Sequence, residues 1–175
     1  MNKKFIVFLF SFLIYFVGII LGIFFSLSVP LADNTTINPI TSSSFLFAIS
    51  LFKVNIIVDL IIVSGLFIFG LPTIILLIIN GFSLGYAITV SYLMHNSIIK
   101  ICIAILPHGI FEIAGLIFAG AVGLNGFKIY FRENKNWKQL SIYLCISIIL
   151  IFIAALVEGL ITPLLLKFLI NKGEV

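Results

Sequence analysis

Residues Ile56–Leu93 read IIVDLIIVSGLFIFGLPTIILLIINGFSLGYAITVSYL and contain a single charged side chain, Asp59. A helix needs about 20 apolar residues to cross the hydrocarbon layer of a bilayer, so this stretch is too long for one crossing. Gly70-Leu71-Pro72 is the best place to divide it, because proline lacks an N–H and disfavours helix in the residue before it. We therefore expect one transmembrane helix at about 54–70 and another at about 73–94.

The composition of the whole chain agrees with a membrane protein. Of 175 residues, 62% are hydrophobic and 9% are charged, and the mean hydropathy is +1.35. A soluble domain carries about 25% charged residues, so this composition excludes a soluble enzyme, a disordered tail and a nucleic-acid-binding protein. The net charge of +4 is better explained by basic residues in cytoplasmic loops than by a nucleic-acid partner.

Three further apolar runs complete the expected fold. Residues 5–28 are too long for the apolar core of a signal peptide, which makes them a retained transmembrane helix. Further helices are expected at about 98–124 and 140–166, and residues 45–55 form a short interfacial or re-entrant helix with Lys53 near its end. The prediction is an all-α, polytopic membrane helix bundle of about five transmembrane helices, in a single domain covering residues 1–175.

Charged residues orient this bundle. Lys3 and Lys4 precede the first helix, the polar loop at 30–44 has no Lys or Arg, and the loop at 125–139 has four basic residues. The positive-inside rule therefore places the N-terminus and the 125–139 loop in the cytoplasm of a multi-pass cell-membrane protein. The 30–44 loop and the C-terminus then lie outside.

Polar side chains inside the apolar runs need a reason, because an ionisable group at the centre of a bilayer costs at least about 2.5–3.5 kcal/mol. The clear cases are Asp59, His108, Glu112 and Glu158, with Asn55 and Asn80 as uncharged companions. Glu158 lies in the middle of its helix and needs a buried partner, for which His108 and Lys100 are candidates. Asn55 and Asp59 lie one turn apart near the outer end of their expected helix, where Asp59 would simply reach the interface.

His108 and Glu112 share one helix face because they are four residues apart. Pro107 comes directly before them, and a proline kink opens room for polar groups in a transmembrane helix. Three interpretations remain: metal or acid–base chemistry, a proton or ion path, and a hydrogen-bonded cluster that locks helices together through Asn80 or Glu158. A zinc site would want a third ligand, so we assign no metal, no cofactor and no catalytic residue.

Small residues predict where helices approach one another. Gly81 and Gly85 form a small-xxx-small pair, and Gly115, Ala119 and Gly123 form a stripe at four-residue spacing after Glu112. We expect both groups to be helix-packing positions. The two cysteines, Cys102 and Cys145, lie in apolar runs and are expected to be small buried residues rather than a disulfide or metal site.

The sequence resembles one family of membrane proteins. Leu106-Pro107-His108-Gly109-Ile110-Phe111-Glu112, followed by the segment Ile117–Leu124, is similar to the signature of the stage II sporulation protein M family. The resemblance covers about 55–124 and includes Asn55, Gly70-x-Pro72 and Asn80-Gly81-x-x-x-Gly85.

That resemblance implies a multi-spanning protein of bacteria or archaea without enzymatic residues. The founding member works in engulfment during sporulation, as a membrane partner of peptidoglycan-degrading proteins. Shorter relatives belong to circular-bacteriocin gene clusters, where they are linked to export, maturation or self-immunity. We therefore expect a non-enzymatic membrane scaffold or partner component, whose partners are the lipid bilayer, other membrane or cell-envelope proteins and a second copy of the chain. The alternatives are a small transporter or immunity factor for a hydrophobic peptide, or ion- or proton-linked transport through His108 and Glu112.

Overall fold

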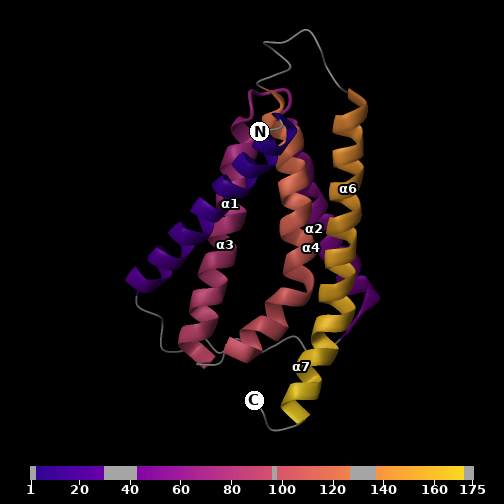
Figure 1. Cartoon of the computed structure of the whole chain (residues 1–175). Coiled ribbons are helices and arrows are strands. Elements are labelled where there is room, and N and C mark those ends of the chain that lie inside the picture. The colour runs from indigo at the N-terminus through magenta and orange to yellow at the C-terminus, as the bar shows by residue number, and fades with distance from the viewer. Residues whose placement is uncertain (1–2, 30–42, 96–97, 127–136, 172–175) are drawn as a thin grey trace.

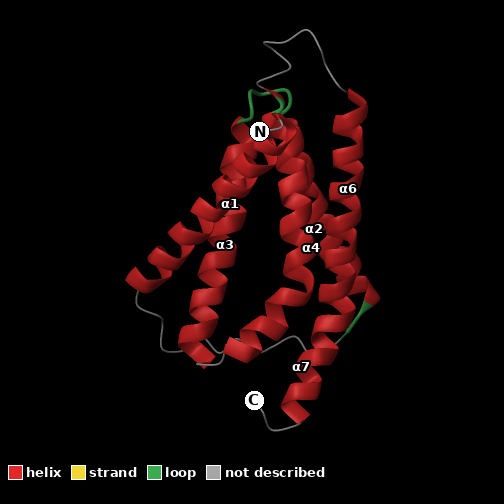
Figure 2. Ribbon diagram, viewed as in Figure 1, coloured by secondary structure: helices red, strands yellow, loops and turns green. Residues whose placement is uncertain are grey.

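The computed structural model describes residues 3–29, 43–95, 98–126 and 137–171. These residues form helices joined by short turns, and no strand occurs among them (Figure 2). The helices are α1 (Lys3–Ser28), α2 (Phe45–Ser64), α3 (Leu71–His95), α4 (Ile98–Leu124), α6 (Trp137–Leu156), the π-helix η1 (Val157–Ile161) and α7 (Thr162–Asn171).

Five membrane-spanning helices confirm the predicted all-α bundle. The apolar spans of the described chain are Phe5–Ser28, Phe45–Ser64, Leu71–Met94, Ile101–Leu124 and Trp137–Phe168. Large apolar side chains such as Phe24 and Leu46 face outward, with 66% and 78% of their surface exposed. Lipid chains are as apolar as these side chains, so the exposed apolar surface is stable in contact with the bilayer.

The helices form two groups. α1 packs mainly on α3, whereas α4 packs mainly on α6 and both contact α2. Figure 1 shows α1 and α3 diverging from α4 below the end that carries the N-terminus, and α4 bending in its first part. Pro107 lies inside α4, and an internal proline removes one helix hydrogen bond and commonly bends a helix.

The second span differs from the expected helix at 54–70 and from the separate short helix at 45–55. It is one continuous helix, Phe45–Ser64, because no proline or glycine interrupts it. Its start is fixed by Pro163: a proline cannot bond the carbonyl four residues earlier, and the freed carbonyl of Gly159 accepts a bond of 3.2 Å from the Ser44 N–H.

The second span ends earlier than expected because a compact turn precedes Pro72. The Gly70 N–H donates to the Gly65 carbonyl at 2.7 Å, and Phe69 and Gly70 have φ angles of 49° and 75°. Thr73 then donates its hydroxyl to the Ile62 carbonyl at 2.7 Å. This bond ties the first turn of α3 to the last turn of α2.

Glycines make the close approach between α1 and α3 possible. A Cβ on Gly18 or Gly22 would overlap backbone atoms of α3, and one on Gly81 or Gly85 would overlap backbone atoms of α1. All four are buried. The two backbones therefore touch along a small-residue seam, as the small-xxx-small pattern favours.

The expectation that both cysteines are buried was wrong. Cys145 is exposed and Cys102 is half-buried, and both are free thiols. Both belong to helices that span the membrane, where a thiol behaves as a small apolar group and needs no burial.

Candidate functional site

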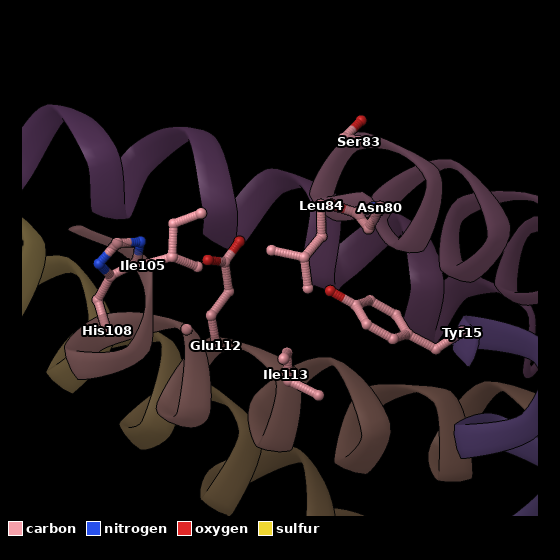
Figure 3. A pocket seen from close by; sticks show the side chains of 9 residues that line it. Tyr15, Asn80, Ser83, Leu84, Ile105, His108, Glu112 and Ile113 are labelled. Carbon is pink, nitrogen blue, oxygen red and sulfur yellow. The ribbon is translucent and has the colours of Figure 1, made fainter. Parts of the chain in front are cut away.

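A cavity of about 190 Å³ lies between α1, α3 and α4. Tyr15 comes from α1, Asn80 and Ser83 come from α3, and His108 and Glu112 come from α4. Apolar side chains complete the lining, namely Leu84, Ile105 and Ile113 (Figure 3). The cavity has room for several water molecules or for the end of one long polar side chain.

α4 brings His108 and Glu112 to this cavity through their four-residue spacing. In Figure 3 the Glu112 carboxyl and the Tyr15 hydroxyl point into the same central space, and the His108 ring lies beyond Ile105. His108 Nδ1 is buried and has no hydrogen-bond partner among the described residues. Glu112 also makes no hydrogen bond or ion pair within the described part of the chain. A buried polar atom without a partner is uncommon and suggests a missing group.

α3 supplies the rim of the cavity. One amide N–H of Asn80 donates to the Leu76 carbonyl at 2.8 Å, and the Ser83 hydroxyl donates to the Ile79 carbonyl at 3.0 Å. Ser83 is exposed, and its hydroxyl points away from the centre of the cavity (Figure 3). Because Ser83 lies near the middle of α3, this part of the lining meets the surface at the level of the lipid chains.

Asp59 belongs to a different place, between α2, α4 and α6. It is 0% exposed, so the expectation that it reaches the interface was wrong: α2 starts earlier, which moves Asp59 away from the outer end. The Ser147 hydroxyl lies 2.7 Å from Asp59 Oδ1 and 2.8 Å from the Gly115 carbonyl oxygen. Asp59 Oδ2 has no hydrogen-bond partner among the described residues.

Two further predicted polar residues do not line the cavity. Asn55 is half-buried on α2, one turn before Asp59. Glu158 lies in η1, within electrostatic range of Glu112. Of the two partners considered for Glu158, the Lys100 side chain lies outside the described residues, and no hydrogen bond joins His108 to Glu158 in the described part of the chain.

The small residues on α4 contact several different neighbours. A Cβ on Gly115 would lie 3.0 Å from Ile151 and 3.3 Å from the Ser147 carbonyl oxygen, both on α6, whereas one on Gly123 would overlap Thr73 and the Ile62 carbonyl. Ala119 is 0% exposed. Gly120, which the sequence reasoning did not single out, packs against Leu77 and Ser11.

Sequence reasoning missed Tyr15 and Ser83 as cavity residues, and Gly18 and Gly22 as packing residues. Gly18 and Gly22 carry a signal, since their four-residue spacing matches that of Gly81 and Gly85. Tyr15 and Ser83 carry none, because a tyrosine or serine in a transmembrane helix has no spacing that points to a distant neighbour. Within the described residues no group of three His, Cys, Asp or Glu is arranged to hold a metal ion.

Comparison with known proteins places the chain in a family. Residues 11–163 match the family model of stage II sporulation protein M. The chain belongs to this family. Within the stage II sporulation protein M family, the matched region contains every residue of the cavity and both glycine pairs of the α1–α3 seam.

One relative extends the comparison across most of the chain. An uncharacterized protein of Methanocaldococcus jannaschii is 34% identical over 155 residues, which cover 79% of this chain and 83% of the relative. No solved structure matches the chain. The shared family therefore rests on sequence over nearly the whole membrane domain.

Proposed function

We propose that this protein is a non-enzymatic membrane component that docks a membrane-embedded segment of a partner protein. The observation that carries the proposal is a polar cavity in the middle of the spans whose lining includes an exposed residue, Ser83, level with the lipid chains. A partner reaches that level by moving laterally in the bilayer. A soluble substrate would instead need an opening at a membrane face.

The chemistry of the cavity supports docking. Glu112 and His108 Nδ1 have no partner among the described residues, and polar groups without partners in a bilayer are costly. A polar side chain from another helix would satisfy them, in the way that polar residues join helices in membranes. Membership of the stage II sporulation protein M family agrees with this role, because the resemblance implies partner proteins of the cell envelope.

Site-specific photo-crosslinking from Ser83 tests the docking role. We expect a crosslinker at position 83 to give one adduct of defined mass in native membranes, and the same group at Ile149, an exposed position on α6, to give none. Glu112→Gln should reduce the yield about tenfold, since loss of one polar contact in a membrane is worth up to about 1.7 kcal/mol. Glu158→Gln, the matched carboxyl outside the cavity, should leave the yield unchanged. A chain that always remains free of adducts contradicts the role.

A second candidate function is movement of a hydrophobic peptide or of a proton through the cavity. The observation that favours it is the convergence of Tyr15, Asn80, His108 and Glu112 from three helices in the middle of the spans. The transport activity, or the resistance to a bacteriocin, that the Glu112→Gln variant retains separates the two functions. If Glu112→Gln leaves that activity at the wild-type level, the transport function is wrong.

A further inference from the structure

Among the described residues, the cavity is lined by an acid but by no lysine or arginine. Its lining consists of Glu112, His108, two polar uncharged groups of α1 and α3, Ser83 at the rim and apolar side chains. A carboxyl group in hydrocarbon is stabilised most by a cation that shares its low-dielectric surroundings. The missing group is therefore expected to carry a positive charge.

A second unpaired charge lies elsewhere on the same chain. Lys53 is in the middle of the span Phe45–Ser64, its side chain is exposed, and it makes no ion pair within the described residues. An ammonium group that faces lipid chains carries the same cost as the acid. Lys53 thus needs an anion that no described residue of its own chain brings to it.

The two charges lie at similar depth in the membrane. The Ser147 hydroxyl touches both Asp59 on α2 and Gly115 on α4, so these two residues mark one level, and α2 and α4 run in the same direction (Figure 1). Lys53 is six residues before Asp59, about 9 Å along the helix, and Glu112 is three residues before Gly115, about 4.5 Å along it. The flexible four-carbon stem of lysine covers the difference of about 4.5 Å.

Two copies of a membrane protein insert with the same orientation, so equal depth within one chain is also equal depth between chains. We propose that Lys53 of one copy inserts its ammonium group into the Glu112 cavity of a neighbouring copy. Each copy then gives one lysine and receives one, around a symmetry axis perpendicular to the membrane. For each copy, this arrangement replaces two separate charges in lipid with one ion pair, so a complex of two copies contains two such pairs. It rests on the proposed role of the cavity as a docking site, and it names a second copy as the occupant.

Self-association of the full chain in lipid vesicles tests this inference. Single-molecule photobleaching counts the copies in each complex as the protein is diluted in the bilayer. We expect wild-type complexes, and a dissociation constant that rises about tenfold in Lys53→Gln and in Glu112→Gln, the change that corresponds to about 1.4 kcal/mol. The matched controls are Lys138→Gln, at the start of α6 and exposed, and Glu158→Gln, which should stay within about threefold of wild type.

The charge-swapped double variant Lys53→Glu with Glu112→Lys keeps the proposal falsifiable when a single variant folds poorly. It should restore association, because the pair is re-formed with its signs reversed. A wild-type chain that is monomeric at all dilutions overturns the inference, as does a Lys53→Gln variant that associates like wild type. If Lys53→Gln has no effect while Ser83 crosslinks to a different protein, the docking role stands and the lysine inference falls. If both charges control association and Ser83 crosslinks only to a second copy, the lysine inference stands and a separate partner protein is excluded at this site.

Discussion

Ser147 has one hydroxyl proton and two oxygen neighbours, Asp59 Oδ1 and the Gly115 carbonyl. The Gly115 carbonyl oxygen can only accept a hydrogen bond. Ser147 can donate its single proton to Gly115 only if the proton in its contact with Asp59 comes from Asp59. We therefore expect the Asp59 carboxyl to be neutral and to donate through Oδ1, which leaves the Ser147 proton for Gly115. Such a chain of two hydrogen bonds would join α2, α6 and α4 without placing a charge in the core, which would be costly.

At the residue scale, Asp59→Asn should keep the fold, because the amide also donates to Ser147. We expect the free energy of unfolding to stay within about 1 kcal/mol of wild type. Asp59→Ala should lose about 1–3 kcal/mol, since it removes the bond and leaves a void. Unfolding by titration with a denaturing detergent measures both, with Ser50→Ala as a control that breaks only a bond within α2.

Infrared spectroscopy checks the protonation state directly. At neutral pH a protonated-carboxyl band should be present in wild type and weaker in Asp59→Asn. An unchanged band in Asp59→Asn would show that the carboxyl is ionised and that the two-bond chain is wrong.

At the scale of the helices, α1 and α3 behave as one unit because their backbones touch. Four glycines create this contact, and any side chain there would push the helices apart. α4 is joined to α6 through larger groups, with the Ile151 side chain against Gly115. The cavity lies between the α1–α3 pair and α4, where fewer residues contact one another. The same arrangement of helices therefore produces both the α1–α3 seam and the cavity.

Gly81→Ala should destabilise the α1–α3 pair, because the new methyl group would overlap the Tyr15 carbonyl. The expected loss is about 1–3 kcal/mol, as for other overpacked positions. Gly109→Ala is the matched control: its nearest neighbour would be an Ile105 methyl at 3.5 Å, an ordinary contact, and alanine favours helix by up to about 1 kcal/mol. The same detergent titration compares them. Equal stability of the two variants would contradict the close backbone contact between α1 and α3 at Gly81.

At the scale of the whole molecule, the described residues contain five helices long and apolar enough to cross a membrane, so we expect the start of α1 and the end of α7 to lie on opposite sides. The turn between α2 and α3 and the end of α4 lie at the same end of the bundle, since Gly126 packs on the carbonyls of Gly65 and Leu66. The N-terminus is at this end too (Figure 1). Lys3, Lys4 and the basic loop at 125–139 favour the cytoplasm for this end.

Reporter fusions test the orientation. Alkaline phosphatase fused after the C-terminal residue should be active, because that end is expected outside, and the same enzyme fused after Asn125 should be inactive. Green fluorescent protein at the same two positions should give the opposite pattern. The reverse result at both positions would mean that the N-terminus lies outside.

The division into five spans follows from the sequence, because the length of an apolar run and the thickness of a bilayer are local quantities. The same holds for the shared face of His108 and Glu112, which helix periodicity fixes. The boundary of α2 does not follow from local signals. Its start depends on the carbonyl that Pro163 leaves free at Gly159 and that Ser44 uses, more than a hundred residues away in the chain.

Tertiary structure alone decided which polar residues meet. The sequence indicated that Asp59, Asn80, His108, Glu112 and Glu158 each need a reason to be in the membrane, but not that Asn80, His108 and Glu112 share a cavity with Tyr15 while Asp59 pairs with Ser147. Periodicity gives the face of a single helix, and it carries no information on the rotation and depth of one helix against another. Those are set by the contact of small residues on separate helices, which exists only once the bundle has formed.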